Sequence, residues 1–189
     1  MVNAGGVAQG ATVGATVGTT VGTTERLFFA LAPDDAARKA MDAHAPVARA
    51  ACGGRAVQAR NLHLTLAFLG HMPVAAVPDV IAAAAAVPRL DYEMVIDQAH
   101  HWRHNRILWL GPSAVPAPVA RMCEALRQAL RDAGVRYDDK PFVPHVTLLR
   151  AARAPATPLA MEPVAWRGRG FSLFAVHRDA TGLRYDAIG

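Results

Sequence analysis

The sequence predicts an α+β protein with two sheet-based lobes and a cleft between them. Short apolar, β-favouring runs alternate along the chain with segments of helical periodicity. A four-residue phrase occurs twice, as residues 63–66 (His-Leu-Thr-Leu) and residues 145–148 (His-Val-Thr-Leu). With 189 residues, 52% of them hydrophobic, the chain can bury a sizeable core as one domain or two small lobes. Two similar halves, each with one phrase, indicate one shared site.

Strands are expected where apolar and β-favouring residues cluster. Two of these strands contain the repeated phrases, and a turn at residues 100–105 joins two others. Alternate side chains of a strand face opposite sides, so each phrase directs its aliphatic residues toward a core. The expected strands cover residues 26–32, 62–69, 91–99, 106–111, 142–149, 169–177 and 183–188.

Helices are expected in three segments, each opened by a proline. The first begins at Pro33, where two aspartates suit the positive end of a helix, and should stop near Pro46, since proline lacks a backbone N–H. The second covers residues 78–87. The third has an apolar stripe, and Gly134 follows its end. It runs from Pro118 to Ala133, with Val119, Met122, Cys123, Leu126 and Leu130 on the stripe.

Residues 1–24 differ in composition from the rest of the chain. They repeat glycine at every fourth position from Gly10, with alanine, threonine and valine between, and they contain no charged side chain. Glycine raises the entropy lost on ordering, and no large side chain offsets that loss. We therefore expect residues 1–24 to be a disordered tail and residues 25–189 to form a single bilobal domain.

Charge, cysteine content and hydropathy narrow the possible classes of function. A net charge of +5 favours anionic partners but names none. The two cysteines, Cys52 and Cys123, form neither a disulfide framework nor a paired metal motif, so a reducing cytoplasm is the expected setting. No apolar run approaches the roughly 20 residues of a membrane-spanning helix, so no membrane association is expected.

Each repeated phrase places an imidazole and a hydroxyl on one side of its strand. Side chains two residues apart share a face, so His63 lies beside Thr65 and His145 beside Thr147. Histidine has an ordinary pKa of about 6.5, so one ring can accept a proton while the other donates one. Threonine hydroxyls can hold the non-bridging oxygens of a phosphate under attack. The pattern therefore favours displacement at phosphorus without a metal or another cofactor.

Two other interpretations of the phrases were weighed. A single histidine of this kind is most often a hydrogen-bonded core or edge residue, but chance would seldom give two copies with the same residue order. A zinc site would need a third or fourth ligand. Neither phrase has a nearby Cys, Asp or Glu, so the zinc interpretation is the weaker one.

The paired His-x-Thr-x phrases resemble the motifs of the two-histidine (2H) phosphoesterase superfamily. Longer stretches are similar to the bacterial and archaeal RNA 2′,3′-cyclic phosphodiesterases of the 2′-5′ RNA ligase family. The resemblance implies a bilobal α+β fold, with two antiparallel-rich sheets, helices outside and a central cleft. It covers residues 26–150 well and the remainder loosely. The stretches that carry it are residues 26–31 (Arg-Leu-Phe-Phe-Ala-Leu), 61–70 (Asn-Leu-His-Leu-Thr-Leu-Ala-Phe-Leu-Gly), 107–111 (Ile-Leu-Trp-Leu-Gly) and 140–150 (Lys-Pro-Phe-Val-Pro-His-Val-Thr-Leu-Leu-Arg).

The resemblance also implies an activity, the hydrolysis of an RNA-terminal 2′,3′-cyclic phosphate to a 2′-phosphate. His63 is then the proton donor to the leaving oxygen, and His145 is the proton acceptor. Thr65, Thr147 and Arg150 bind the phosphate. Expected partners are RNA ends or nucleoside 2′,3′-cyclic phosphates, and the protein is expected to be a monomer. The alternatives are 2′-5′ RNA ligase activity in the same site and a non-catalytic RNA-end binding protein.

Three assignments depend on geometry that the sequence leaves open. Arg150 lies five residues after His145, on the opposite face of a regular strand, so it reaches the cleft only if the strand bends or ends just before it. Phe28 and Phe29 point to opposite sides of their strand, and Phe29 is assigned to stack on a base, although both can be core residues. Residues 100–106, rich in histidine and arginine, are expected to form a solvated turn or a basic rim that guides RNA.

Overall fold

Two antiparallel sheets form the framework of the protein, whose computed structural model describes residues 23–180 and 182–189. Residues 1–22 of the expected tail lie outside the described residues. The α+β class with antiparallel-rich sheets, predicted from the sequence, is confirmed. The strands are β1 (Thr24–Leu31), β2 (Arg55–Ala56), β3 (Leu64–Pro73), β4 (Asp91–Ile96), β5 (Gln98–Trp102), β6 (Ile107–Gly111), β7 (Val146–Arg150), β8 (Val164–Arg169), β9 (Ser172–Asp179) and β10 (Gly182–Ala187).

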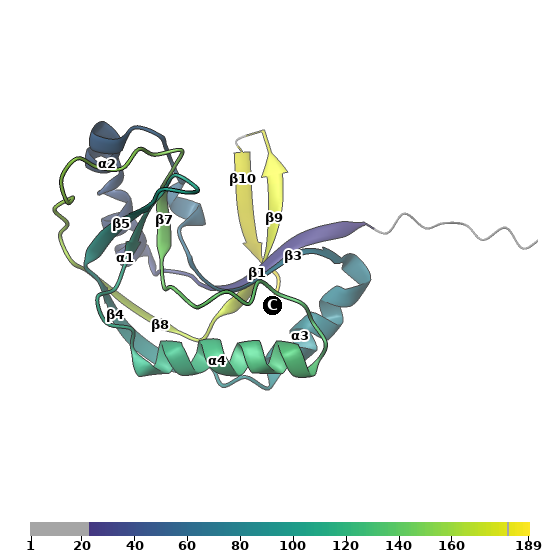
Figure 1. The fold of residues 1–189 in the computed structure, drawn as a ribbon. Helices are drawn as coiled ribbons and strands as arrows, with labels where there is room; N and C mark the ends of the chain where they lie inside the picture. The colour runs from purple at the N-terminus through teal and green to yellow at the C-terminus, as the bar shows by residue number, and fades with distance from the viewer. Residues whose placement is uncertain (1–22, 181) are drawn as a thin grey trace, which may run out of the picture.

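The large sheet has two halves, which join between β3 and β7 (Figure 1). Its strand order is β10-β9-β1-β3-β7-β6-β5, with β2 paired to β7, and the small sheet pairs β4 with β8. Between β3 and β7 the register contains a single residue pair, Leu64 with Val146. These residues directly follow His63 and His145. The junction of the two halves therefore brings the two repeated phrases together from distant parts of the sequence.

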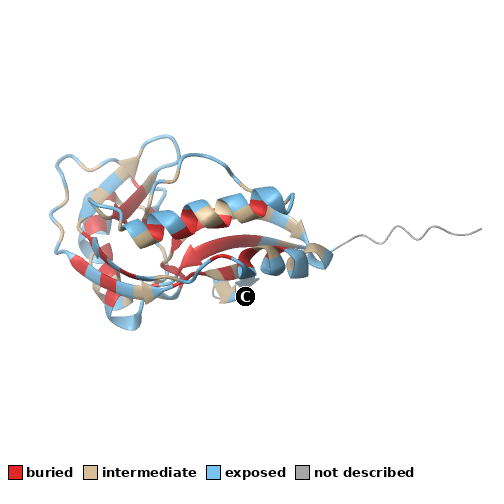
Figure 2. Ribbon diagram, turned by 90° about the horizontal axis from the view of Figure 1, so that it is seen from below, coloured by how far each residue is buried: buried red, intermediate tan, exposed pale blue. Residues whose placement is uncertain are grey.

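The α-helices of the described residues cover the outer sides of the sheets. They are α1 (Asp35–Asp42), α2 (Ala45–Cys52), α3 (Val77–Ala85) and α4 (Ala117–Asp132). In Figure 1, α3 and α4 lie along the lower side of the molecule, and α1 and α2 lie in the lobe that contains β5 and β7. The apolar stripe of α4 is buried, as its periodicity predicts. Figure 2 shows buried residues on the strands behind α4 and on the side of the helix that faces them.

Some predicted elements differ from the structure. The first helix ends at Asp42, and Pro46 lies in the first turn of α2, where a proline gives up an N–H that has no helical partner. The predicted strand at residues 91–99 is two strands, since β4 ends at Ile96 and pairs with β8 whereas β5 pairs with β6. The strand β8 was not predicted, because only two of its six residues, Val164 and Trp166, are buried and large, and the exposed Ala165 between them weakens the alternation of apolar and polar residues.

Candidate active site

The register at the junction gathers the four polar residues of the two phrases. The paired residues, Leu64 and Val146, are fully buried, so the residues on either side of them face away from the core. Continuing the antiparallel register by one position sets these neighbours across from each other, at the spacing of directly opposed side chains. The opposed pairs are His63 with Thr147 and Thr65 with His145.

A pocket of about 250 Å³ opens at this point of the sheet. Both histidines, both threonines and Arg150 line it, so the structure brings together all the residues that the sequence assigned to catalysis and phosphate binding. No carboxylate from the described residues is part of the lining. Positive charge combined with aromatic rings suits an anion attached to a planar group. The other lining residues are Arg26, Phe28, Phe68, Trp102, Asn105, Ile107, Val176 and Tyr185.

Each histidine ring is held by the backbone carbonyl two residues before it. His63 Nδ1 lies 2.7 Å from the carbonyl oxygen of Asn61, and His145 Nδ1 lies 2.8 Å from that of Val143. A carbonyl oxygen only accepts hydrogen bonds, so Nδ1 carries the proton and donates in both rings. In the neutral ring Nε2 is then unprotonated. Both Nε2 atoms can therefore exchange a proton with a molecule in the pocket.

Burial holds both histidines in the neutral form. It lowers the pKa of His63 from 6.5 to about 4, against the hydrogen bond to Asn61, which favours the charged ring. Burial also lowers the pKa of His145, against the hydrogen bond to Val143. Repulsion from His145 lowers the pKa of His63 further, and the positive charge of Arg150 lowers the pKa of both rings. An anion in the pocket acts in the opposite direction and raises both pKa values.

Aromatic rings fix the orientation of His63. The centroid of the Phe28 ring lies 4.6 Å from that of the imidazole, and the Tyr185 ring meets the imidazole edge-on at 5.2 Å. Buried Asn61 links this arrangement to β10, because its Nδ2 donates to the Leu183 oxygen at 2.7 Å and its Oδ1 accepts from the Tyr185 N–H at 3.3 Å. Asn61 therefore positions His63 from both its main chain and its side chain.

Two tryptophans have the same role beside His145. The Trp102 ring, from the end of β5, lies 4.5 Å from the imidazole, and the Trp109 ring, from β6, lies 5.9 Å away. Both rings are inclined by 67° to the imidazole plane, and they contact each other at 5.1 Å. Each histidine is thus held by one backbone hydrogen bond and two aromatic neighbours. Asn61, Tyr185 and the tryptophans were not assigned to the site from the sequence.

A β-bulge directs Arg150 into the pocket. The single step from Trp109 to Leu108 on β6 corresponds to residues 147–149 on β7, which is one residue longer. The inserted residue, Leu148, shifts the alternation of side chains by one position. Arg150 thereby comes to the side that faces the pocket, although it lies an odd number of residues after the histidine. The bend that the sequence analysis required is this bulge.

Phe29 lies outside the pocket, so its assignment to stack on a base is wrong. Its ring is 1% exposed and packs edge-on against Phe171 in the core, at 5.7 Å. Phe28 takes the pocket side of β1, but it is only 3% exposed and packs against His63. The alternation of side chains along β1 correctly predicts that the two phenylalanines point to opposite faces of the sheet. It could not show which face is the core, because both side chains are apolar and both are buried.

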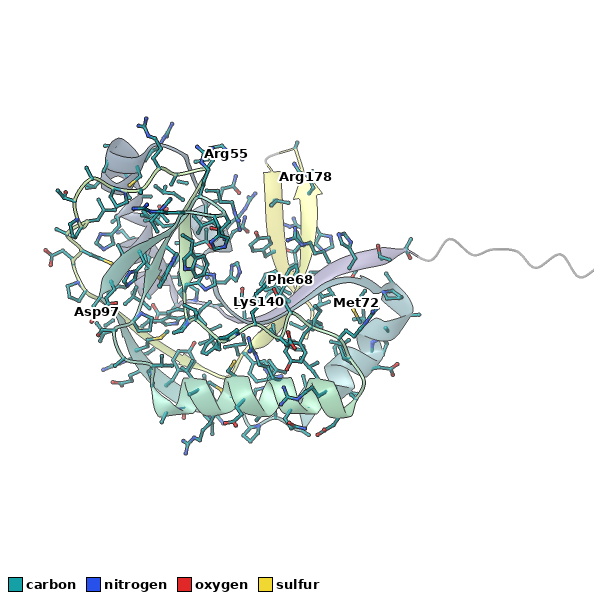
Figure 3. The ribbon with its side chains drawn as sticks, viewed as in Figure 1. Arg55, Phe68, Met72, Asp97, Lys140 and Arg178 are labelled. Atoms are coloured by element: carbon teal, nitrogen blue, oxygen red, sulfur yellow. The ribbon has the colours of Figure 1, made fainter. Side chains whose placement is uncertain are left out.

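A second pocket, of about 570 Å³, continues from the histidine pocket, and the two are called the groove below. Half-buried Phe142 and two aromatic rings from the first pocket line it. Its cations already have partners, since Lys140 pairs with Asp138 at 2.9 Å and Arg127 donates to two backbone oxygens. Figure 3 places Lys140 beside Phe68, and the second pocket, which both residues line, is called the lower end of the groove below. The residues common to both pockets are Thr65, Phe68, Trp102, Asn105 and His145.

The histidines around the β5–β6 hairpin lie in different surroundings. Residues 103–106 are exposed, as expected of a solvated turn, but His101 is half-buried with Nε2 3.2 Å from the Ala152 oxygen. Within residues 23–180 and 182–189, no group of three or more His, Cys, Asp or Glu is placed to hold a metal ion. The same residues include no helix of sufficient length and apolar character to cross a membrane.

The fold matches solved structures of 2H phosphoesterases. A crystal structure of Escherichia coli LigT complexed with 3′-AMP superposes with a TM-score of 0.78 and 29% sequence identity, covering 88% of this chain and 97% of that chain. The crystal structure of TT0787 of Thermus thermophilus superposes with a TM-score of 0.73 and 28% identity, covering 87% of this chain and 95% of that chain. The bilobal 2H phosphoesterase fold implied by the sequence is confirmed.

Sequence comparison gives the family. The profile of the 2′-5′ RNA ligase superfamily matches residues 33–179, and the chain belongs to this superfamily, as predicted. A Thermus thermophilus protein named RNA 2′,3′-cyclic phosphodiesterase is 30% identical over 174 residues, which cover 86% of this chain and 87% of that protein. An Escherichia coli (strain K12) protein of the same name is 35% identical over 104 residues, which cover 55% of this chain and 59% of that protein, less than two thirds of its length.

Proposed function

We propose that this protein hydrolyses the 2′,3′-cyclic phosphate at an RNA end and leaves a 2′-phosphate. One observation supports this above all: two histidines, both with Nδ1 held by a backbone carbonyl, line one pocket together with two threonines and Arg150. The relatives named RNA 2′,3′-cyclic phosphodiesterase support the choice of substrate. The groove also matches the substrate chemically, since it combines positive charge for the phosphate with aromatic rings for a nucleoside.

In the proposed reaction, one bond to phosphorus forms as another breaks. Water attacks the phosphorus atom, and His145 Nε2 takes the proton that the water loses. The bond from phosphorus to the 3′ oxygen breaks, and protonated His63 gives its Nε2 proton to that oxygen. Each turnover leaves His145 charged and His63 neutral, so proton exchange with solvent restores the starting pair. The histidines carry out both proton transfers without a metal or another cofactor.

The lowered histidine pKa values couple substrate binding to protonation. With a pKa of about 4, His63 is neutral in the free protein at neutral pH. An anionic phosphate in the pocket stabilises the protonated ring, so substrate binding helps to load the proton that His63 later donates. The hydroxyls of Thr65 and Thr147 donate hydrogen bonds to the non-bridging oxygens. Arg150 balances the negative charge that these oxygens carry during attack.

A nucleoside 2′,3′-cyclic phosphate, supplied with an excess of chelator, tests the proposal. Substituting either His63→Ala or His145→Ala should lower kcat by about 10²–10⁴-fold, because each change removes one proton transfer. The matched control is His71→Ala, since His71 is exposed and lies outside the pocket. Chromatography of the product should show the 2′-monoester. Unchanged turnover in both pocket variants would rule the mechanism out.

The remaining expectations about this protein belong to the same proposal. We infer that residues 25–189 act as a single-domain monomer in a reducing compartment such as the cytoplasm. One hydrophobic core cluster combines residues from both halves of the large sheet, which supports a single domain, and both cysteines are buried and free of disulfides. Light scattering during size-exclusion chromatography measures the mass in solution. A dimer mass at micromolar concentration would contradict the monomer.

A further inference from the structure

Three long segments of the chain contain no Asp or Glu. They are residues 43–78, 98–123 and 140–161, and each of them contributes to a wall of the groove. Leaving histidine aside, every charged side chain in these segments is therefore an arginine or a lysine. Acidic residues are placed elsewhere, for example on α1, β4 and the later turns of α4. The cationic residues of the three segments are Arg49, Arg55, Arg60, Arg103, Arg106, Arg121, Lys140, Arg150 and Arg153.

The fold collects four of these arginines around the end of β7, where Arg150 lines the histidine pocket. Arg55 on β2 pairs in register with Arg150 on β7. Arg106 lies beside the residues that follow, because its Nη2 donates to the Ala151 oxygen at 3.2 Å. Arg153 is tied to the segment before β2, since its N–H donates to the Cys52 oxygen at 2.8 Å. The arginine cluster is defined as Arg55, Arg106, Arg150 and Arg153, all exposed.

No carboxylate of the described side chains pairs with the arginine cluster. The ion pairs found among the described residues involve cations outside the cluster, such as Lys140 with Asp138 and Arg167 with Glu93. Neighbouring like charges without a counterion raise the local positive potential, which attracts a polyanion. Figure 3 places Arg55 at the top of the lobe that contains β7, with Arg178 on the β9–β10 hairpin. The Arg150 side of the histidine pocket therefore differs in chemistry from the second pocket, where the cations have partners.

We propose that the arginine cluster binds the phosphodiester backbone of the RNA strand that leads to the cyclic end. Arg150 belongs to both the cluster and the histidine pocket, so a strand whose terminal phosphate lies between the histidines can continue over it toward Arg55 and Arg153. The lower end of the groove suits a base instead, because its cations are already engaged and its free surfaces are aromatic rings. The preferred substrate is therefore an oligonucleotide end rather than a free nucleoside cyclic phosphate. This inference rests on the proposed function.

The test compares kcat/KM for a ten-nucleotide RNA with a 2′,3′-cyclic end and for a nucleoside 2′,3′-cyclic phosphate, over a series of salt concentrations. The oligonucleotide should be preferred, and the double substitution Arg55→Gln with Arg153→Gln should reduce this preference by about tenfold. The slope of log(kcat/KM) against log[salt] for the oligonucleotide should become shallower by about 1.4, which is about 0.7 for each lost phosphate contact. The control is Arg167→Gln with Arg169→Gln, which removes the same charge from β8 outside the groove.

Equal kcat/KM values for the two substrates in the unchanged protein would overturn the inference. Equal salt slopes in the two double variants would also overturn it. A loss of the preference in Lys140→Gln alone would overturn it too, because it would show that the RNA strand runs along the lower end of the groove. If neither substrate is hydrolysed, the proposed function fails separately. The strand path is then decided by fluorescence anisotropy of the labelled RNA, where weaker binding by the Arg55→Gln, Arg153→Gln variant supports it and unchanged binding rejects it.

Discussion

His63 and His145 each donate the same kind of hydrogen bond to a backbone carbonyl, but they have different aromatic neighbours. This bond fixes the tautomer of both rings, and because the acceptor is a main-chain carbonyl, no neighbouring side chain has to accept the proton of Nδ1. The neighbours differ because they come from different lobes, Phe28 and Tyr185 on one side and Trp102 on the other. Both rings therefore present Nε2 to the pocket, although different aromatic residues from different lobes hold them in place.

The pH dependence of kcat/KM should report the pKa values of these rings in the free protein. Burial and Arg150 lower both, so the optimum should lie below 6.5, the ordinary pKa of histidine. Arg150→Gln should lower kcat/KM by about 10²-fold, through loss of a charge on the phosphate. The same change should move the optimum to higher pH, because it removes a positive charge that opposes protonation.

Arg150→Lys is the matched control for this measurement, since it keeps the charge. Its optimum should stay close to that of the unchanged protein. Phosphate binding should still weaken, because an ammonium cannot donate the two parallel hydrogen bonds that a guanidinium gives to a phosphate. An optimum that stays in place in Arg150→Gln would show that Arg150 has no electrostatic effect on the histidine pair.

At the scale of elements, the end of β7 depends on a glycine in the neighbouring strand connection. Gly54 has a φ of +83°, and a Cβ there would lie 2.6 Å from the Arg150 oxygen and 3.0 Å from the Ala152 nitrogen. The close approach lets β2 pair with the end of β7. The direction of Arg150 therefore depends on both the bulge within its own strand and the absence of a side chain opposite it.

Gly54→Ala should lower both stability and activity. A Cβ at positive φ costs about 1–2 kcal/mol by itself, and the contact with the Arg150 oxygen adds to this and displaces the arginine. Gly134→Ala provides the control, because Gly134 has a φ of +68° but nothing within 4 Å of the added Cβ. Thermal unfolding and KM are measured for both. A similar loss of Tm and a similar KM in the two variants would contradict a role for the close approach.

The sequence predicts the strands and helices around this site better than the directions and contacts of their side chains. The strands around His63 and His145 follow from apolar runs, and the burial of α4 follows from its stripe. The bulge was not predictable, because Leu148 and Leu149 are both buried and satisfy either face of β7. Asn61 was missed for a different reason, since its partner Leu183 lies 122 residues further along the chain and leaves no local signal.

At the scale of the whole molecule, the site lies where the two halves of the large sheet meet. A single residue pair, Leu64 with Val146, joins the halves by register, and the half-buried histidines lie directly beside it. The two histidines that the proposed reaction needs to titrate are therefore shielded by the packing that holds the halves together. Their pKa values and the global stability are consequently linked through the same burial.

Acid should destabilise the fold through His63. Its pKa is about 4 in the folded chain, whereas the unfolded chain has the ordinary value of 6.5. Between these values the unfolded chain binds more protons, so stability falls as the pH falls from 6.5 towards 4, by up to about 3 kcal/mol. Urea unfolding at pH 7 and pH 4.5 measures the difference. His63→Gln should show a smaller loss, and an equal loss would assign the acid sensitivity to other groups.

The position of the tryptophans has a practical consequence. Of the three in the chain, Trp102 and Trp109 contact His145, whereas Trp166 is buried in the core against Tyr92. Intrinsic fluorescence should therefore report on the protonation of His145 and on ligand binding beside it, over a constant background from the third indole. Ligand titrations can thus be followed optically in inactive variants, with no dye attached to either molecule.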